Sequence, residues 1–513
     1  MGGLAALIAL IALVLAPSTG ASSSRLGRHA DPARARPAQA YPIEPTIAAV
    51  VSANQTGPAM PSGFVGLSLE YHALVPYAGR DPNALNPVFI ALMRALSPGQ
   101  PTVLRIGGDS TDQTWWPMPG VVAPGGINFS LTKDWLRVAR AVAAKIDARL
   151  LLGVNMAADS PALAGAEGRA LLQGIGSRYL DALEIGNEPD VYTEFAWFAS
   201  PAGRVYYARP ASYDLQDYFE DFARWRAALP TGVPVAGPAF ATETWMSELP
   251  SFLSAEPGTS VVTFHRYPLR GCETNVQAGD YPSISNLLSD TSSEGLAQSI
   301  APYVVTAHAA GIPFRLDELN SASCSGKLGV SNTFASALWV LDTLFSLASV
   351  DVDGVNIHTL PGAAYQPFSF TEQGSHWSAS VKPLYYGLLM FEQAFPAGAR
   401  QLSVDAPTGP VKVYATQTSS GQIHVVIINK DPITPVVVRV QLPGPQTPAQ
   451  SEALSAPSVS STSGVSLGGE SFGASTTTGV LPTNPHPTTV SPTLGYYTVT
   501  LPGGSALMLT TTG

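Results

Sequence analysis

Charge is scarce in this chain, and positive charge is scarcer than negative. Of its 513 residues 12% are charged, with 27 Lys and Arg against 37 Asp and Glu, which gives a formal net charge of -10 at pH 7. Proteins that bind nucleic acid normally carry a basic stripe or patch. The composition therefore excludes nucleic acid as an expected partner and favours a neutral or locally selected ligand.

Long apolar runs are also rare. The run from Leu4 to Ala16 has about the length of a signal-peptide core and is short for a membrane span. We expect a signal peptide over residues 1–21, a disordered tether over residues 22–45, and secretion without a stable membrane partner. A short uncleaved membrane anchor is the alternative.

After Gly63 the sequence alternates short aliphatic runs with longer amphipathic stretches, which is typical of parallel strands joined by helices. Helical candidates are residues 132–146, 213–228, 294–309, 333–347 and 383–394. We predict an α/β fold, a (β/α)8 barrel over residues 57–398, with a doubly wound open sheet as the alternative. The eight expected strands are residues 64–71, 102–108, 149–155, 180–187, 234–240, 261–267, 313–320 and 352–359.

From about residue 400 the pattern changes to period-two strands separated by turns rich in Gly, Pro and Ser. This predicts an all-β sandwich over residues 399–513, joined by a strand from residues 46–56 and interrupted by a low-complexity loop over residues 451–492. Its expected role is to pack against the barrel; a carbohydrate-binding module is the alternative.

Polar residues stand where the predicted strands end, and in barrels of this kind that face carries the chemistry. The 8 histidines show no metal-ligand spacing, and no glycine-rich phosphate loop is present, so we expect neither a metal nor another cofactor. The strand-end residues are Glu70, Tyr71, Asp109, Asn155, Asn187, Glu188, His265, Tyr267, Glu318, Asn320 and His358.

Two glutamates at opposed strand ends are what cleavage of a glycosidic bond requires, one as proton donor and one as the carboxylate that meets the sugar carbon. Strand alternation puts Glu184 and Glu188 on one side, but Pro189 ends the strand just beyond Glu188 and favours it at the rim. In the later strand both Asp317 and Glu318 can face inward, and we interpret Asp317 as a structural acid.

Four motifs resemble glycoside hydrolase family 79, which contains β-glucuronidases and heparanases, and the resemblance covers residues 46–513. It implies Glu188 as acid/base, Glu318 as nucleophile, Asn187 on the sugar 2-hydroxyl and Tyr267 bonded to the nucleophile. It also implies that Glu70 and Asp109 bind glycone hydroxyls and that Tyr365 faces the substrate carboxylate. The motifs are Leu104-Arg105-Ile106-Gly107-Gly108, Ile185-Gly186-Asn187-Glu188-Pro189, His265-Arg266-Tyr267-Pro268 and Asp317-Glu318-Leu319-Asn320-Ser321.

The chain departs from the family just after Glu318. The family's glucuronidases commonly carry Tyr-Gly-Gly there, whose backbone amides hold the uronate carboxylate, whereas this chain has Ser323-Cys324-Ser325-Gly326-Lys327. We expect Lys327 to bind the carboxylate instead; a lysine in solvent is the alternative. The predicted enzyme is an exo-acting retaining β-glycosidase on a carbohydrate substrate, foremost a β-glucuronidase, with β-glucosidase, diglycosidase or a catalytically silent carbohydrate-binding barrel as alternatives.

Cys272 and Cys324 are the two cysteines of the chain. Each follows a predicted strand, and those strands are neighbours in the barrel, so both loops emerge on the same face. In an exported chain this predicts a disulfide, with two unpaired thiols as the alternative.

Overall fold

The structure is a computed structural model, and it describes residues 46–484 and 486–511. The predicted signal peptide and tether, residues 1–45, lie outside the described residues. Within those residues, every helix is too short or too polar to reach across a bilayer.

Eight parallel strands close into a barrel, which confirms the fold class predicted from the sequence. Pairing of β15 with β2 and of β7 with β10 closes the ring and excludes the open-sheet alternative. Because both faces of such strands are covered, they consist of nearly continuous aliphatic residues. The strands are β2 (Val65–Glu70), β3 (Thr102–Gly107), β6 (Ala148–Val154), β7 (Leu180–Ile185), β10 (Val235–Phe240), β11 (Thr259–Arg266), β13 (Phe314–Leu319) and β15 (Gly354–Thr359).

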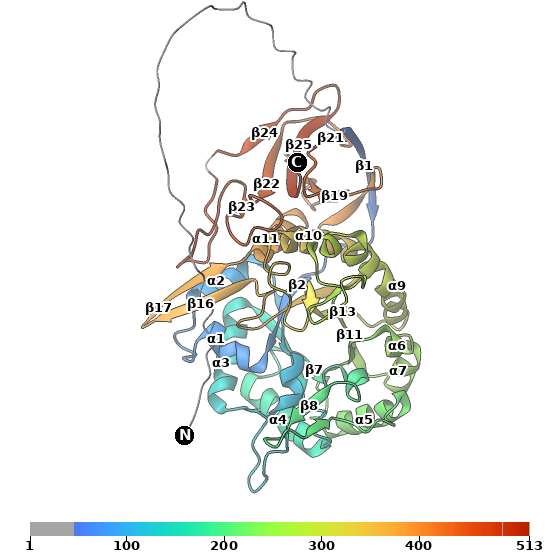
Figure 1. Cartoon of the computed structure of the whole chain (residues 1–513), viewed down its shortest axis with the longest axis vertical. Coiled ribbons are helices and arrows are strands. Elements are labelled where there is room, and N and C mark those ends of the chain that lie inside the picture. Colours follow the sequence, from blue (N-terminus) through green and yellow to red (C-terminus); the bar gives the residue numbers. More distant parts are fainter. Residues whose placement is uncertain (1–45, 485, 512–513) are drawn as a thin grey trace, which may run out of the picture. The chain divides into compact units, whose positions relative to one another are not determined.

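Helices surround the barrel strands (Figure 1). Capping residues set where several of them begin. At the start of α3 the Thr132 hydroxyl accepts a hydrogen bond from Trp135 N. At the start of α4 the Ser160 hydroxyl accepts one from Leu163 N, and Pro161 is the first helical residue. The helices are α1 (Leu74–Ala78), α2 (Pro87–Ala95), α3 (Lys133–Ile146), α4 (Pro161–Ile175), α5 (Leu215–Ala228), α6 (Glu243–Met246), α7 (Leu249–Ala255), α8 (Ile284–Leu287), α9 (Glu294–Ala309), α10 (Phe334–Ser349) and α11 (Pro383–Ala394).

Four short two-stranded sheets lie in the loops between the described elements. They are β4 (Thr114–Trp115) with β5 (Phe129–Ser130), β8 (Ala196–Ala199) with β9 (Val205–Tyr207), β12 (Leu269–Arg270) with β14 (Ala322–Ser323), and β16 (Phe368–Gln373) with β17 (His376–Val381).

The remaining strands form one hydrogen-bonded ten-stranded sheet that folds over its own core. β1 joins its two halves, since Thr46–Val50 pairs in parallel with β21 and Val50–Thr56 pairs antiparallel with β18. Side chains such as Ile427, Val438 and Val499 share one apolar core. The other strands are β18 (Arg400–Asp405), β19 (Val411–Gln417), β20 (Ile423–Asn429), β21 (Val436–Gln441), β22 (Ala449–Ser455), β23 (Ser466–Leu467), β24 (Thr488–Val490), β25 (Tyr497–Leu501) and β26 (Ser505–Thr511).

The segment predicted as a low-complexity loop has a defined structure. Its first residues belong to β22, and the carbonyls of Val459 and Ser461 accept hydrogen bonds of 2.8 Å from the first turn of α10. Phe472 packs edge-on against Tyr385 and Tyr386 of α11. Backbone hydrogen bonds and a few buried apolar side chains, among them Val465, Leu467 and Phe472, fix this segment, and neither leaves a periodic pattern in the sequence.

Two lysines of the sheet form ion pairs with the barrel. Lys430 is buried and lies 2.7 Å from Asp342 Oδ2 in α10 and 2.6 Å from Asp290 Oδ1. Lys412 in β19 lies 2.9 Å from Asp290 Oδ2 and 3.3 Å from Glu294 Oε2 at the start of α9. The sheet therefore contacts the barrel through charged as well as apolar side chains.

Candidate active site

A cavity of about 1220 Å³ opens at the carboxyl ends of the barrel strands. It is larger than the roughly 300–1,000 Å³ of pockets that hold a drug-sized ligand. Seven of the eight residues expected to act in catalysis or substrate binding line it: Glu70, Asp109, Asn187, Glu188, Tyr267, Glu318 and Tyr365.

Glu318, next to last in β13, is held at both carboxylate oxygens. Tyr267 donates a hydrogen bond of 2.7 Å to Oε1, and Arg105 Nη1 donates one of 2.6 Å to Oε2. Burial opposes the charge, but His358, His265, Arg105 and the Tyr267 bond together lower the pKa of Glu318 far below its usual range. Glu318 is therefore an anion at neutral pH, as a nucleophile must be.

Glu188 follows β7 in a left-handed turn. Its φ and ψ are 52° and 51°, and Pro189 directly after it begins the short helix η3 (Pro189–Val191). The turn brings Glu188 to the cavity, where 24% of its side chain is exposed. Glu184, four residues earlier, is fully buried. The rim position therefore belongs to Glu188.

His265 in β11 lies between the two glutamates. Its Nδ1 is 3.0 Å from Glu188 Oε1 and 3.9 Å from Glu318 Oε2. One oxygen of each carboxyl and a nitrogen of His265 lie within 4.8 Å of one another. The two carboxyls therefore face the same small volume of the cavity.

The tautomer of His265 follows from Arg105. Burial lowers the pKa of His265, but the charges of Glu318 and Asp317 raise it to about 9. Arg105 Nη2 nevertheless lies 3.1 Å from Nε2, and arginine can only donate. If Nε2 also carried a proton, that hydrogen would point at the hydrogen of Arg105 Nη2, and two positively charged groups would face each other. In the neutral ring the proton is therefore on Nδ1, toward Glu188, and Nε2 accepts from Arg105.

Arg105 in β3 is fully buried and joins the base of the site. Its Nε donates 2.8 Å to Glu184 Oε2, and its Nη2 donates 2.9 Å to Asn187 Oδ1, in addition to the bond to Glu318. Burial opposes its charge, but Glu184, Asp317 and Glu318 raise its pKa further. Sequence reasoning gave Arg105 no role. The available signal was a basic residue within an aliphatic buried strand.

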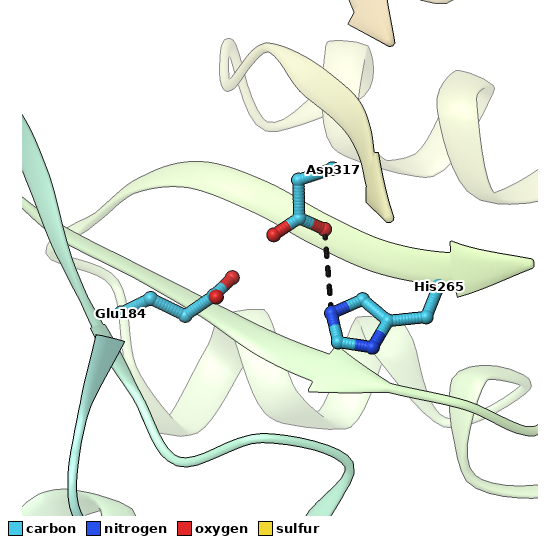
Figure 2. A group of neighbouring side chains, drawn as sticks. All are labelled: Glu184, His265 and Asp317. Atoms are coloured by element: carbon cyan, nitrogen blue, oxygen red, sulfur yellow. Dashed lines mark ion pairs between the residues drawn. The ribbon is translucent and has the colours of Figure 1, made fainter. Parts of the chain in front are cut away.

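Two further acids lie beside Arg105. Figure 2 shows Asp317 facing His265, with Glu184 directed toward the same space; Asp317 Oδ1 is 3.7 Å from His265 Nε2. Burial and the charge of Glu184 raise the pKa of Asp317 well above its usual value, whereas Arg105 lowers that of Glu184 against the effect of burial. Of the two carboxyls, Asp317 is therefore the one that binds a proton more readily.

Two side-chain groups have metal-like spacing, Glu184–His265–Asp317 and Glu188–His265–Glu318, each with donor atoms within 4.8 Å. Arg105 lies 2.8 Å from Glu184 and 2.9 Å from Asp317, so its guanidinium supplies the cation of the first group. In the second group Arg105 and Tyr267 already bind Glu318. Neither donor set fits a resident metal ion.

Glu70 ends β2 as an ionised acceptor. Ser110 N donates 2.8 Å to its Oε2, and His358 Nε2 lies 3.5 Å from Oε1. Burial raises the pKa of Glu70, but His358 lowers it below its usual value overall. Gly108, with φ +70°, passes so close that a Cβ there would lie 2.5 Å from Glu70 Oε1, which explains the second glycine of the Gly107-Gly108 pair.

Asp109 has the opposite protonation. Its side chain is accessible from the cavity yet enclosed by protein, and it has no hydrogen bond with any described residue. This enclosure, followed by the negative charges of Glu70, Glu188 and Glu318, raises the pKa of Asp109 to about 8. At neutral pH Asp109 is therefore a hydrogen-bond donor beside an acceptor.

Lys327 is not brought to the cavity. Its side chain is exposed, and the loop lines the cavity through Ser323, Cys324 and Ser325. The backbone turns at Cys324 and Ser325, which have φ of 53° and 62°, and Lys327 N donates to Ser331 Oγ on the far side of this turn. The structure therefore gives no support to the expected contact between Lys327 and a substrate carboxylate, which stays a prediction.

Tyr365 lines the cavity near His358, with ring centroids 6.0 Å apart. Its hydroxyl has no hydrogen-bond partner among the described residues. Of the other strand-end residues, Asn155 and Asn320 donate to backbone carbonyls, and the Tyr71 hydroxyl bonds Gly153 O. These three stabilise the barrel rather than the cavity surface.

The predicted disulfide between Cys272 and Cys324 is present, with Cα atoms 5.8 Å apart. It lies beside the parallel pair β12 and β14, in which Leu269 and Ala322 are partners. It therefore ties the loop after β11 to the loop after β13, and Cys324 itself lines the cavity.

Two curated proteins are similar to this chain, both named Beta-glucuronidase. The one from Aspergillus niger is 25% identical over 264 residues, 48% of this chain and 47% of that protein. The one from Neurospora crassa is 22% identical over 393 residues, 68% of this chain and 66% of that protein. The chain thus spans from about half to just under two thirds of these relatives. No family model matches the chain.

Among solved structures, a 4-O-alpha-L-rhamnosyl-beta-D-glucuronidase from Fusarium oxysporum matches with a TM-score of 0.68 and 18% identity, over 90% of this chain and 100% of that one. The GH51 arabinofuranosidase from Xanthomonas axonopodis pv. citri matches with a TM-score of 0.62 and 13% identity, over 91% and 99%. At these identities the likeness establishes the fold, a (β/α)8 barrel with an attached β-sheet region.

Proposed function

We propose that this protein is a glycoside hydrolase, an exo-acting retaining β-glycosidase of the kind grouped in family 79. The observation that carries the proposal is the pair Glu188 and Glu318, whose oxygens come within 4.8 Å at the cavity. Their surroundings differ, because Glu318 is buried among donors and cations while Glu188 is partly exposed beside His265. Different environments for two close carboxyls are what an acid and a nucleophile need.

In the first step Glu318 attacks the anomeric carbon while protonated Glu188 gives its proton to the departing oxygen, so one C–O bond forms as the other breaks. Asn187 Oδ1 is bonded to Arg105, which leaves its amide N–H groups for the sugar 2-hydroxyl. In the second step Glu188, now a carboxylate, takes a proton from water, and that water displaces Glu318 and restores the β configuration.

A β-glucuronide is the proposed glycone. It is supported by the names of both curated relatives and by two neutral donors at the cavity, Tyr365 and protonated Asp109. A neutral β-glucoside or diglycoside is the second candidate. It is favoured because the described lining has no free cation to bind a sugar carboxylate. No lysine lines the cavity, and its two arginines are already paired, Arg266 with Glu243 at 2.6 Å and Arg270 with Asp280 at 2.5 Å.

The test uses aryl β-glycosides that differ only at the sugar C5 substituent. Hydrolysis with the β-anomer as first-formed product in proton NMR supports a retaining enzyme, and an α-anomer at early time would show an inverting one. Preference for the glucoside would replace the glycone but keep the mechanism. Binding of the panel without turnover would identify a silent carbohydrate-binding barrel.

The Cys272–Cys324 disulfide supports the further proposal that the chain is exported, because disulfides persist in oxidising compartments.

A further inference from the structure

The position of Glu188 fixes where the leaving group lies. An acid/base residue protonates the oxygen between the glycone and the aglycone, so chain segments beside Glu188 and away from Glu318 face the aglycone. The segment that directly follows Glu188 does line the cavity, through Glu194, Phe195, Ala196 and Trp197.

Two aromatic side chains of this segment face the cavity. Phe195 is 67% exposed and lines the acidic cavity. Trp197 in β8 is half-buried, and its Nε1 donates 2.8 Å to Asp112 O. Asp112 Oδ2 in turn accepts from Asn187 N at 3.2 Å. The Trp197 ring is therefore tied to the turn that carries the acid/base residue.

Packing behind the ring keeps it in place. Trp197 and Phe198 meet edge-to-face at 5.2 Å, and Phe198 stacks on Tyr206 of β9 at 4.6 Å. A Cβ on Gly126 would lie 2.6 Å from the Trp197 ring, so the backbone approaches it closely. A ring held in this way is already in position when a ligand arrives, and less conformational entropy is lost on binding.

Charge around the cavity restricts the ligand further. Ten carboxyl groups line the described cavity, against the two arginines already paired with acids. Because no lysine lines the described cavity and both of its arginines are already paired with acids, a sulfated or carboxylated aglycone would find no free cation there. Aromatic faces, by contrast, bind the apolar faces of rings.

We propose that Phe195 and Trp197 form the aglycone subsite of this cavity, and that its occupant is an uncharged leaving group with an apolar ring face. The ring can be aromatic or a pyranose. The inference rests on the proposed glycosidase function and specifies its substrate class.

The experiment compares kcat/KM for four substrates that share the glycone accepted by the wild type. Their aglycones are methyl, naphthyl, an uncharged pyranose and a sulfated pyranose. Phe195→Ala should lower kcat/KM about three- to ten-fold for the ring aglycones, the size of one aromatic contact, and by less than two-fold for methyl. The naphthyl and pyranose arms show which ring is preferred. Phe195→Tyr should restore the loss.

Tyr207→Ala is the matched control, because Tyr207 is 50% exposed on the same hairpin and lies outside the cavity lining. Equal losses on methyl and naphthyl substrates in Phe195→Ala, or wild-type preference for the sulfated aglycone, would overturn the subsite. Calorimetric binding of the corresponding naphthyl and methyl thioglycosides separates the two proposals. No hydrolysis, together with weaker naphthyl binding in Phe195→Ala, would refute the glycosidase but keep the subsite, whereas equal naphthyl binding would refute the subsite.

Discussion

Arg105 Nη1 and Glu318 Oε2 lie 2.6 Å apart, and the guanidinium that makes this contact is fully buried. The same guanidinium binds Glu184 and Asn187. One side chain from β3 therefore holds Glu318 of β13 in a fixed position relative to Asn187, which follows β7 and directly precedes Glu188.

Glu318→Ala should abolish turnover of every substrate, because each passes through the glycosyl-enzyme. Glu188→Ala should slow substrates with poor leaving groups far more than those with good ones, because a good leaving group departs without a proton in the first step. Initial rates over a series of aryl leaving groups measure this difference. Substantial activity in Glu318→Ala would disprove the assignment.

Tyr267→Phe removes the 2.7 Å hydrogen bond to Glu318. A hydrogen bond to a charged group contributes about 1.5–3 kcal/mol, so we expect kcat/KM to fall about ten-fold or more. Because this bond helps to lower the pKa of Glu318, its loss raises that pKa. The acid limb of the pH profile should therefore move to higher pH. An unchanged limb would assign Tyr267 a purely steric role.

Asp109→Asn should change how thermal stability depends on pH. Native Asp109 keeps its proton up to about pH 8, while the unfolded chain releases it near the ordinary value of 3.8. Between these values the native state binds more protons, so this group makes stability fall as pH rises. The Tm of the variant minus that of the wild type should grow up to about pH 8 and then level off. A constant difference would contradict the raised pKa.

Replacing both cysteines by serine should lower stability. The bridge spans 52 residues, for which the chain-entropy relation gives about 4 kcal/mol. Denaturant unfolding of the oxidised wild type, the reduced wild type and the double variant measures the change, and the last two should agree. Two free thiols in the unreduced protein, found by mass spectrometry, would argue against the bridge.

Lys430→Met leaves Asp342 buried without its ammonium partner. Removing one member of a buried pair costs about 3–5 kcal/mol, which urea unfolding can detect. The double variant Lys430→Met with Asp342→Leu should recover most of the loss, because it removes the uncompensated charge as well. No recovery would show that the pair acts through packing.

The barrel was predictable because burial on both faces makes its strands continuous aliphatic runs. Glu188 was predictable because Pro189 marks where its strand ends. Arg105 was not, because its role arises from side chains of β7 and β13 that meet only once the barrel closes. The exposure of Lys327 was equally hidden, since it depends on two left-handed residues, Cys324 and Ser325, that sequence preferences do not favour there.

The pairing of β1 has a consequence for biosynthesis. β1 ends at Thr56, whereas β18 begins only at Arg400 and β21 at Val436. At about 5–20 residues per second, translation of the intervening chain takes on the order of 20–70 s. During that time neither partner strand of β1 has been synthesised. Its eleven residues carry no charge, so its backbone N–H and C=O groups are available to pair with another chain. Slower or crowded translation should therefore expose this segment to pairing between nascent chains.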